Sequence, residues 1–349
     1  MIMRLHLSLA VAALALTAAG AAAQTGVRVD APVRVVVPEV ARAVRTHAYQ
    51  GRNNGPEQTA RFSRKIKLGA DGRVSVQNIA GNIIVTAGGG DEMSIEAVKR
   101  TRGDQSQLAT VHIDVDERSG RVDVRTTHTA GNDRVSVDYT IVVPASASVD
   151  VKSVSGDLKV SGAHGTVRAE TVSGNVTATD APRLESAKTV SGDVLLTAVA
   201  ADGDLAAGSV SGNVTAKGLK ARGLDLGSVS GDVNVTDVTC ERLSVKSISG
   251  NVEYAGGIAK AGRYEINSHS GDVRLVLANP AGFELNASSF SGTIRSELAM
   301  TIGGDADQRG RDGRRRDGRS NHSMHATFGD GSATLTVRTF SGNVTISKR

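Results

Sequence analysis

One six-residue phrase, Ser/Thr-Val-Ser-Gly-Asp/Asn-Val in its commonest form, recurs along this chain and limits the folds open to it. The first eight copies lie about 18 to 21 residues apart, a period close to that of solenoid proteins, in which each repeat forms one coil, and the last copy follows a long insertion. Because one coil cannot bury its apolar face alone, the coils must stack. The copies occupy residues 153–158, 171–176, 189–194, 209–214, 228–233, 247–252, 268–273, 289–294 and 339–344.

Short runs of alternating apolar and polar residues flank each phrase, which is typical of strands joined by turns. The pattern predicts an all-β protein, a single parallel β-solenoid (β-helix) of about 19–20 residues per coil, right-handed because parallel crossovers are right-handed. Two aliphatic columns are predicted to face inward. The first contains Leu158, Val176, Val194, Val214, Val233, Val252, Val273, Ile294 and Val344. The second contains Val160, Ala178, Leu196, Ala216, Val235, Tyr254 and Leu275.

The second residue of the phrase has no clear direction, because a Ser-Gly turn separates it from the inward columns and interrupts the alternation. It is Val154 in the first copy, stays aliphatic as far as Ile248, and becomes His269, Phe290 and Phe340 in the last three. If these side chains face outward, they form an exposed apolar stripe along the stack.

The residue after the glycine alternates between aspartate and asparagine. Carboxylates on adjacent coils would lie about 5 Å apart and repel, whereas alternation doubles that distance and lets each asparagine amide donate to a neighbouring carboxylate. We interpret these as structural turn residues. A calcium-binding ladder is the alternative, but calcium-binding β-rolls repeat a glycine-rich nonapeptide, which this chain lacks. The column contains Asp157, Asn175, Asp193, Asn213, Asp232, Asn251, Asp272 and Thr293.

Residues 1–23 have the pattern of a secretory signal peptide: Arg4, an apolar run over 7–19, and three small residues at 21–23. That run is short for a transmembrane anchor, and no later segment is long and apolar enough to cross a bilayer. We therefore expect an exported protein, periplasmic or extracellular at the cell surface. Its single cysteine, Cys240, forms no internal disulfide and is interpreted as a small packed residue.

The mature chain divides by pattern. Residues 24–60 are polar and read as a linker or lead-in, and 61–150 hold less regular strands that are expected to cap the N-terminal end. Residues 151–349 form the regular β-solenoid. An Arg/Gly-rich insertion at 301–332 interrupts it and is predicted to be disordered.

The repeated phrase resembles the bacterial putative-adhesin family of unknown function, whose members are β-strand-repeat proteins. Residues 90–100 resemble the strand that follows the first coil in that family, 135–144 their entry into the regular repeats, and 333–346 their closing coil. The resemblance covers the chain from about residue 62 onward and implies the architecture. It transfers no catalytic or binding residue to this chain.

No catalytic site is recognisable, and the chain is interpreted as a non-enzyme. A polysaccharide hydrolase on a β-helix would need two carboxylates facing one cleft, and sugar sites usually have aromatic platforms. Here the acidic residues are dispersed over turns, aromatic residues make up 3% of the chain, and tryptophan is absent. No cofactor or metal is expected, since His322 and His325 alone are too few ligands for a metal.

The insertion contains the only concentrated charge and could bind a polyanion such as an anionic envelope polymer. Nucleic acid is not expected as a partner, because export and scarce aromatic residues argue against it. The favoured function is therefore an exported adhesin-like or envelope-binding protein, with a self-associating structural scaffold of the envelope as the alternative. The candidate polyanion-binding residues are Arg309, Arg311, Arg314, Arg315, Arg316 and Arg319.

Overall fold

The structure is a computed structural model that describes residues 56–129, 134–278, 280–302 and 323–349. Its first part contains β1 (Gln58–Lys67), β2 (Arg73–Ala80), β3 (Ile83–Gly88), β4 (Glu92–Thr101), the short 3-10 helix η1 (Gln105–Thr110), β5 (Val111–Arg118), β6 (Arg121–His128) and β7 (Val135–Pro144). The middle contains β8 (Ser148–Ser155), β9 (Leu158–Ser161), β10 (Val167–Ser173), β11 (Val176–Thr179), β12 (Leu184–Lys188), β13 (Val194–Thr197), β14 (Ala200–Ser211), β15 (Val214–Lys217), β16 (Lys220–Ser230), β17 (Val233–Ser249), β18 (Val252–Gly256), β19 (Arg263–Ser270) and β20 (Val273–Leu277). The last part contains β21 (Phe283–Ser291), β22 (Ile294–Ser296), β23 (Thr301–Ile302), β24 (Ser323–Phe328), β25 (Ala333–Ser341) and β26 (Val344–Lys348).

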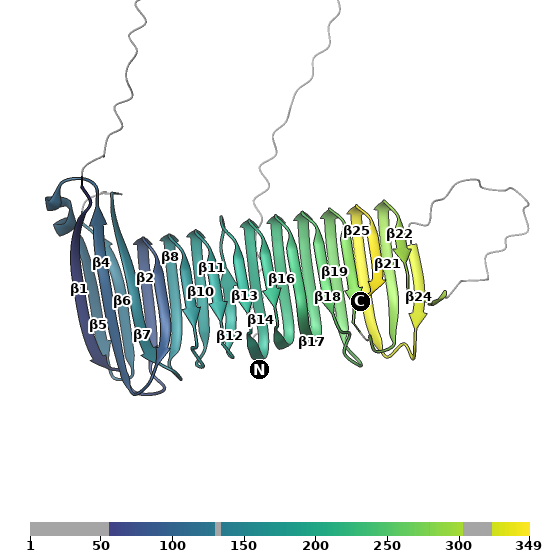
Figure 1. Ribbon diagram of the computed structural model, residues 1–349, viewed down its shortest axis with the longest axis horizontal. Helices are drawn as coiled ribbons and strands as arrows, with labels where there is room; N and C mark the ends of the chain where they lie inside the picture. The colour runs from purple at the N-terminus through teal and green to yellow at the C-terminus, as the bar shows by residue number, and fades with distance from the viewer. Residues whose placement is uncertain (1–55, 130–133, 279, 303–322) are drawn as a thin grey trace, which may run out of the picture. The chain divides into compact units, whose positions relative to one another are not determined.

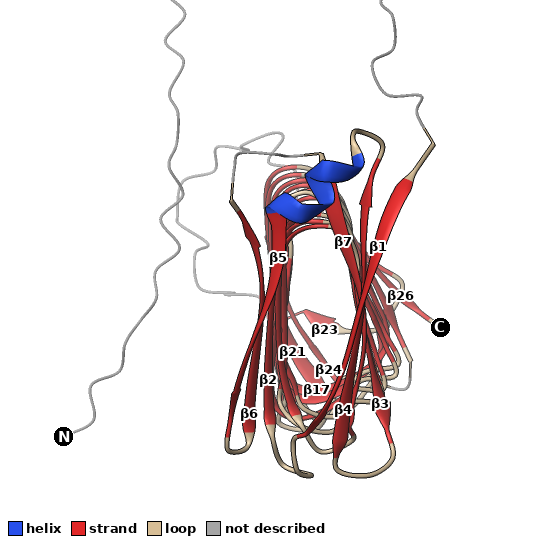
Figure 2. Cartoon of the chain, turned by 90° about the vertical axis from the view of Figure 1, so that its left-hand side faces the viewer, coloured by secondary structure: helices blue, strands red, loops and turns tan. Residues whose placement is uncertain are grey.

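The predicted all-β class is confirmed, and the strands form two facing sheets (Figures 1 and 2). The first sheet runs β1-β4-β7-β3-β9-β11-β13-β15-β17-β18-β20-β26-β22. The second runs β5-β6-β2-β8-β10-β12-β14-β16-β17-β19-β25-β21-β24-β23, so β17 belongs to both. Each coil contributes one strand to each sheet, and its phrase forms the turn between them.

Both predicted inward columns are buried between the sheets, as the alternation within the short strands required. The second sheet contributes its own buried column, in which leucine and valine recur at equivalent register positions, for example Leu224 opposite Leu243. Stacked aliphatic side chains make up most of the core between the sheets, and their burial is the main source of stability.

The prediction of a wholly parallel solenoid was too simple, because the sheets are mixed. The regular coils pair in parallel, but β1–β4, β4–β7 and β5–β6 at one end and β21–β24 and β23–β24 at the other are antiparallel. At the N-terminal end η1 lies across the space between the sheets (Figure 2), and Arg64 of β1 reaches Glu117 of β5 at 2.6 Å. Antiparallel hairpins and charged side chains cover strand edges that would otherwise accept another chain.

The order of coils in space differs from their order in the sequence. β25 lies between β19 and β21, and β26 lies between β20 and β22, so the C-terminal coil is inside the stack (Figure 1). The same exchange occurs at the other end, where β2 lies between β6 and β8 and β3 between β7 and β9. The expectation from family resemblance that residues 333–346 close the stack is therefore wrong in position.

Two predicted boundaries also change. Residues 301–332 were expected to be a disordered insertion, but β23 and β24 lie inside that range, because β24 pairs with the outer edge of β21 and buries Ala326 against the core. β1 begins at Gln58, inside the stretch predicted as lead-in, because Phe62 and Ile66 of that strand pack on the core.

Candidate binding surface

An apolar stripe follows the edge of the stack where the second sheet turns into the first. Each regular coil adds the second residue of its phrase, and the strand pairings hold these residues in one row. The exposed members range from 37% for Ile79 to 71% for Phe290, while Val229 is half-buried. In spatial order the stripe contains Ile79, Val154, Val172, Val190, Val210, Val229, Ile248, His269, Phe340 and Phe290.

The direction of the stripe, left open by the sequence, is settled by the serine or threonine before it. That side chain is buried in every regular copy, for example Thr189 and Ser209. In the copies other than those of Ser153 and Thr339, its hydroxyl donates to the carbonyl oxygen of a turn glycine, as Thr189 does to Gly174 at 2.8 Å and Ser209 to Gly192 at 2.8 Å. Since neighbouring side chains on a strand point to opposite faces, the residue that follows must face outward.

The stripe ends in three stacked rings. His269 and Phe340 have ring centroids 5.0 Å apart with planes 8° from parallel, and Phe340 and Phe290 are 4.7 Å apart at 4°. These three residues come from separated parts of the sequence and meet only because the C-terminal coil inserts between the other two. The rings cover one another's faces and present their edges outward, continuing the aliphatic row with aromatic groups.

A ladder of aspartate and asparagine runs beside the stripe, on the other side of the glycine turn. The backbone N–H of each ladder residue donates to Oδ1 of the residue on the preceding coil, as Asn175 does to Asp157 and Asn213 to Asp193, at 2.8 and 2.7 Å. The sequence analysis expected the asparagine amide to be the donor. In the structure the donor is mainly the backbone N–H. In spatial order the ladder contains Asp138, Asn82, Asp157, Asn175, Asp193, Asn213, Asp232, Asn251, Asp272, Asn343 and Thr293.

Alternation of charge in this ladder is completed by the inserted coils. Asn343 lies between Asp272 and Thr293, and Asn82 lies between Asp138 and Asp157, so no two carboxylates are adjacent. Each Oδ1 is already occupied by a backbone N–H, which supports the interpretation of these residues as structural. Among the described residues, no group of three or more His, Cys, Asp or Glu side chains is arranged to hold a metal.

A row of cations lies on the opposite side of the stripe, two residues before it on the outer face of the second sheet. Lys152, Lys188, Lys246 and Arg338 are exposed in this row, and Glu170 is its one acidic member among the regular coils. Lys152 and Glu170 form an ion pair at 3.2 Å. The stripe is therefore bordered by cations on one side and by the Asp/Asn ladder on the other.

One member of the stripe escaped the sequence analysis. Ile79 belongs to the segment Asn78-Ile79-Ala80-Gly81-Asn82, which lacks the serines of the phrase. Asn78 replaces the buried hydroxyl, and its amide donates to the carbonyl of Gly81 at 3.1 Å and to that of Val137 at 2.8 Å. The Gly-Asn pair followed by an aliphatic run was the signal that could have revealed this coil.

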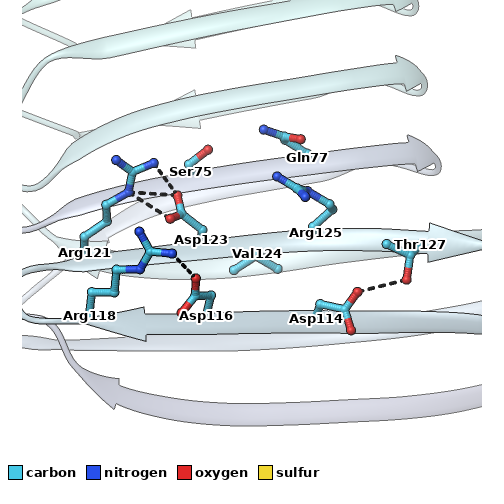
Figure 3. Close-up of a pocket in the computed structure, with 10 residues that line it drawn as sticks. All are labelled: Ser75, Gln77, Asp114, Asp116, Arg118, Arg121, Asp123, Val124, Arg125 and Thr127. Atoms are coloured by element: carbon cyan, nitrogen blue, oxygen red, sulfur yellow. Dashed lines mark hydrogen bonds and ion pairs between the residues drawn. The ribbon is translucent and has the colours of Figure 1, made fainter.

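A hollow of about 400 Å³ at the N-terminal end of the second sheet is the other candidate site (Figure 3). Its charges pair with each other: Arg118 contacts Asp116 at 2.6 Å, and Arg121 contacts Asp123 at 2.8 Å. Thr127 donates to Asp114 at 2.9 Å. Asp116 and Asp123 are each paired with an arginine two residues away on the same strand, and the hollow is open to solvent. It therefore lacks the desolvated acid pair that glycoside hydrolysis needs.

Cys240 is buried, and burial raises the pKa of its thiol from 9.0 to about 12. We expect an aromatic disulfide reagent at pH 8 to leave the folded protein unlabelled and to react fully after denaturation. The raised pKa also stabilises the fold below pH 9, and this contribution is lost as the pH rises from 9 toward 12, because the unfolded chain then loses the proton first. Rapid labelling of the native protein would contradict the buried position.

The predicted polyanion-binding arginines, Arg309 to Arg319, and His322 lie outside the described residues. His325 is described on β24, where its Nδ1 lies 2.5 Å from Oδ1 of Asn286 on β21. Within the described ranges, the structure contains no helix with the length and apolarity of a membrane span.

The chain is similar to one protein family and to several solved structures. The model of one protein family, described as Toastrack DUF4097, matches residues 165–347. No curated protein sequence matches the chain significantly. Similar solved structures include a putative adhesin from Bacteroides fragilis (13% identity, 83% of this chain and 97% of that chain covered, TM-score 0.40). Others are a putative lipid binding protein from Parabacteroides distasonis (9%, 85% and 98%, 0.38) and a putative cell adhesion protein from Clostridium sporogenes (9%, 84% and 100%, 0.22).

Proposed function

Since this chain belongs to the Toastrack DUF4097 family, a family of unknown function, we propose from its surface that it is an exported, non-enzymatic, adhesin-like protein. It binds a component of the cell envelope or cell surface along the apolar stripe. Export follows from the signal-peptide pattern of residues 1–23, and the stripe supplies the contact.

The stripe is the observation that carries this proposal. Its ten side chains are spaced about 4.8 Å apart, so it extends for about 43 Å without a polar interruption other than His269. Soluble proteins seldom leave a continuous apolar surface of this extent in water unless it contacts a partner. A single long row, repeated on each coil, suits a long or repetitive partner better than a small molecule.

The polar groups support binding without catalysis. The ladder carboxylates accept backbone hydrogen bonds. In the N-terminal hollow, Asp116 and Asp123 are paired with arginine, and Asp114 accepts a hydrogen bond from Thr127. Catalytic groups need a free lone pair or proton aimed at a substrate, and these groups are engaged elsewhere. The cation row beside the stripe adds a preference for partners that carry negative charge, such as an anionic envelope polymer.

A pull-down on isolated envelope fractions tests the proposal. The variant V154T/V172T/V190T replaces one methyl group of each valine by a hydroxyl and nearly keeps the side-chain shape. We expect it to bind at least about tenfold less than wild type. Leu195→Thr, at an exposed position on the first sheet, is the matched control and should bind normally. Contact through the stripe should persist in high salt, since apolar contact is not screened.

Two results would contradict the proposal. Equal binding by wild type and the triple variant would remove the stripe as the contact. Binding by neither protein to any fraction would remove the envelope as the partner. Circular dichroism melting of each variant excludes misfolding as the cause of lost binding, because all the substituted side chains lie on outer faces.

A further inference from the structure

We infer that the partner which fits the stripe best is a second copy of this chain, packed with its stack parallel to the first about a two-fold axis that runs along the stacks. This inference rests on the proposed function, because it uses the same surface. The partner is a second molecule of this protein, on the same cell or on a neighbouring one.

Matching of spacing is the first argument. A partner that contacts all ten side chains of the stripe must present apolar groups every 4.8 Å or so, which is the separation of stacked coils. A second copy has this spacing by construction, so its stripe residues lie at the same heights along the stack as those of the first. With a two-fold axis along the stack, each stripe residue faces the same residue of the other copy.

Charge is the second argument, and it selects the orientation. Rotation about the stack axis brings the cation row of one copy against the Asp/Asn ladder of the other, coil for coil. Lys152 then faces Asp157 of the second copy, and Lys188 faces its Asp193. The acidic Glu170 faces Asn175, which is neutral. Lys246 and Arg338 face Asn251 and Asn343. In the ladder Asn251 lies between Asp232 and Asp272, and Asn343 lies next to Asp272.

The antiparallel arrangement lacks this complementarity. A two-fold axis perpendicular to the stacks would set cation row against cation row and ladder against ladder. With all ten coils overlapping, Lys188 would then face Lys246 and Lys152 would face Arg338, at a cost in free energy. The parallel arrangement has no like-charged pair on any of the ten coils.

The contact area of the stripe limits the affinity of the dimer. The stripe and its two bordering rows are roughly 43 Å long and 14 Å wide, or about 600 Å² per copy, below the roughly 800 Å² per partner of a standard interface. We therefore expect a reversible dimer that forms at micromolar concentration and above, so that clustering on a surface would strengthen it.

Disulfide trapping tests the orientation. The native thiol is buried, so an introduced cysteine on the stripe is the reactive one. Val190→Cys should form a covalent homodimer under mild oxidation, because in the parallel arrangement residue 190 faces itself. Ile248→Cys should do the same. In the antiparallel arrangement residue 190 would face residue 248, so only a mixture of the two variants would cross-link. Lys159→Cys, exposed on the first sheet, is the control and should stay monomeric.

Sedimentation equilibrium of the unmodified chain measures the affinity. Lys188→Glu, which would face Asp193 of the second copy, should weaken the dimer about three- to tenfold, and Lys159→Glu should not. A monomer at all concentrations, or cross-linking only in the V190C and I248C mixture, would overturn the inference. If envelope pull-down still depends on the stripe in that case, the proposed function stands with a different partner.

Discussion

Gly174→Ala should lower the free energy of unfolding by roughly 2–4 kcal/mol, the range for backbone strain combined with a steric clash. Gly174 has φ 145°, a conformation that residues with a Cβ rarely adopt. A Cβ atom there would overlap the carbonyl oxygen of Gly156 on the preceding coil, and would lie 2.5 Å from its carbonyl carbon. Both are backbone atoms of the stack and cannot move without separating two coils.

Two other glycines separate the causes of that loss. Gly203→Ala places a Cβ in open space at an ordinary φ, so the melting temperature should stay within about 1 °C of wild type. Gly218 has φ 63° but no atom closer than 3.9 Å to a Cβ, so its substitution measures the conformational strain alone, about 1–2 kcal/mol. Thermal and urea unfolding followed by circular dichroism gives all three values. If Gly174→Ala were no worse than Gly218→Ala, the coil-to-coil clash would not be what requires glycine.

Deletion of residues 333–349 should destabilise far more than removal of a terminal repeat normally does. The deleted coil is inside the stack, so its loss leaves β19 and β20 without partners on one side and detaches β21, β22 and β24 from the rest. It also removes the buried methyl group of Ala333 and four larger buried side chains, each worth roughly 1.5–3 kcal/mol: Leu335, Val337, Val344 and Ile346.

Hydrogen exchange resolves where the damage falls. We expect protection to be lost throughout residues 283–302 and 323–328, although these residues remain in the truncated chain, while β8 to β16 keep theirs. A matched control is deletion of residues 347–349 alone, which removes only the end of β26 and should leave protection unchanged. Retained protection over 283–302 in the longer deletion would mean that the coil of β21 and β22 pairs directly with β19 and β20, which contradicts a structural requirement for the inserted coil.

Most of the regular stack could be predicted from residues alone. The inward columns at Val176 and Ala178 and the turn at each Ser-Gly pair follow from two rules, that side chains alternate on a strand and that glycine permits the turn. The rules did not reveal the copy at residues 78–82, because that copy lacks the serines of the phrase. At Asn78 an amide performs the role of the buried hydroxyl. A first coil before residue 90 was expected from the family resemblance, but its copy of the phrase was not recognised.

The candidate surface depended more on structure. The sequence showed that a column of valines ends in His269, Phe290 and Phe340, but it left their direction open, because a turn lies between this column and the inward ones. The hydrogen bonds of buried hydroxyls such as Ser209 fix the direction, and these bonds exist only once neighbouring coils are in register.

The repeated phrase was enough to predict the all-β class, the period of the coil, the two inward columns and the glycine turn. These depend on interactions within one repeat or between a repeat and an identical neighbour, and periodicity records them. The tertiary structure alone decided which coils are neighbours. A strand edge accepts any strand of matching register, so Asn343 could join Asp272 as well as the sequence-adjacent Thr293 could. The choice places an amide between the aspartate and the last coil, and it stacks Phe340 between His269 and Phe290, which gives the stripe its aromatic end.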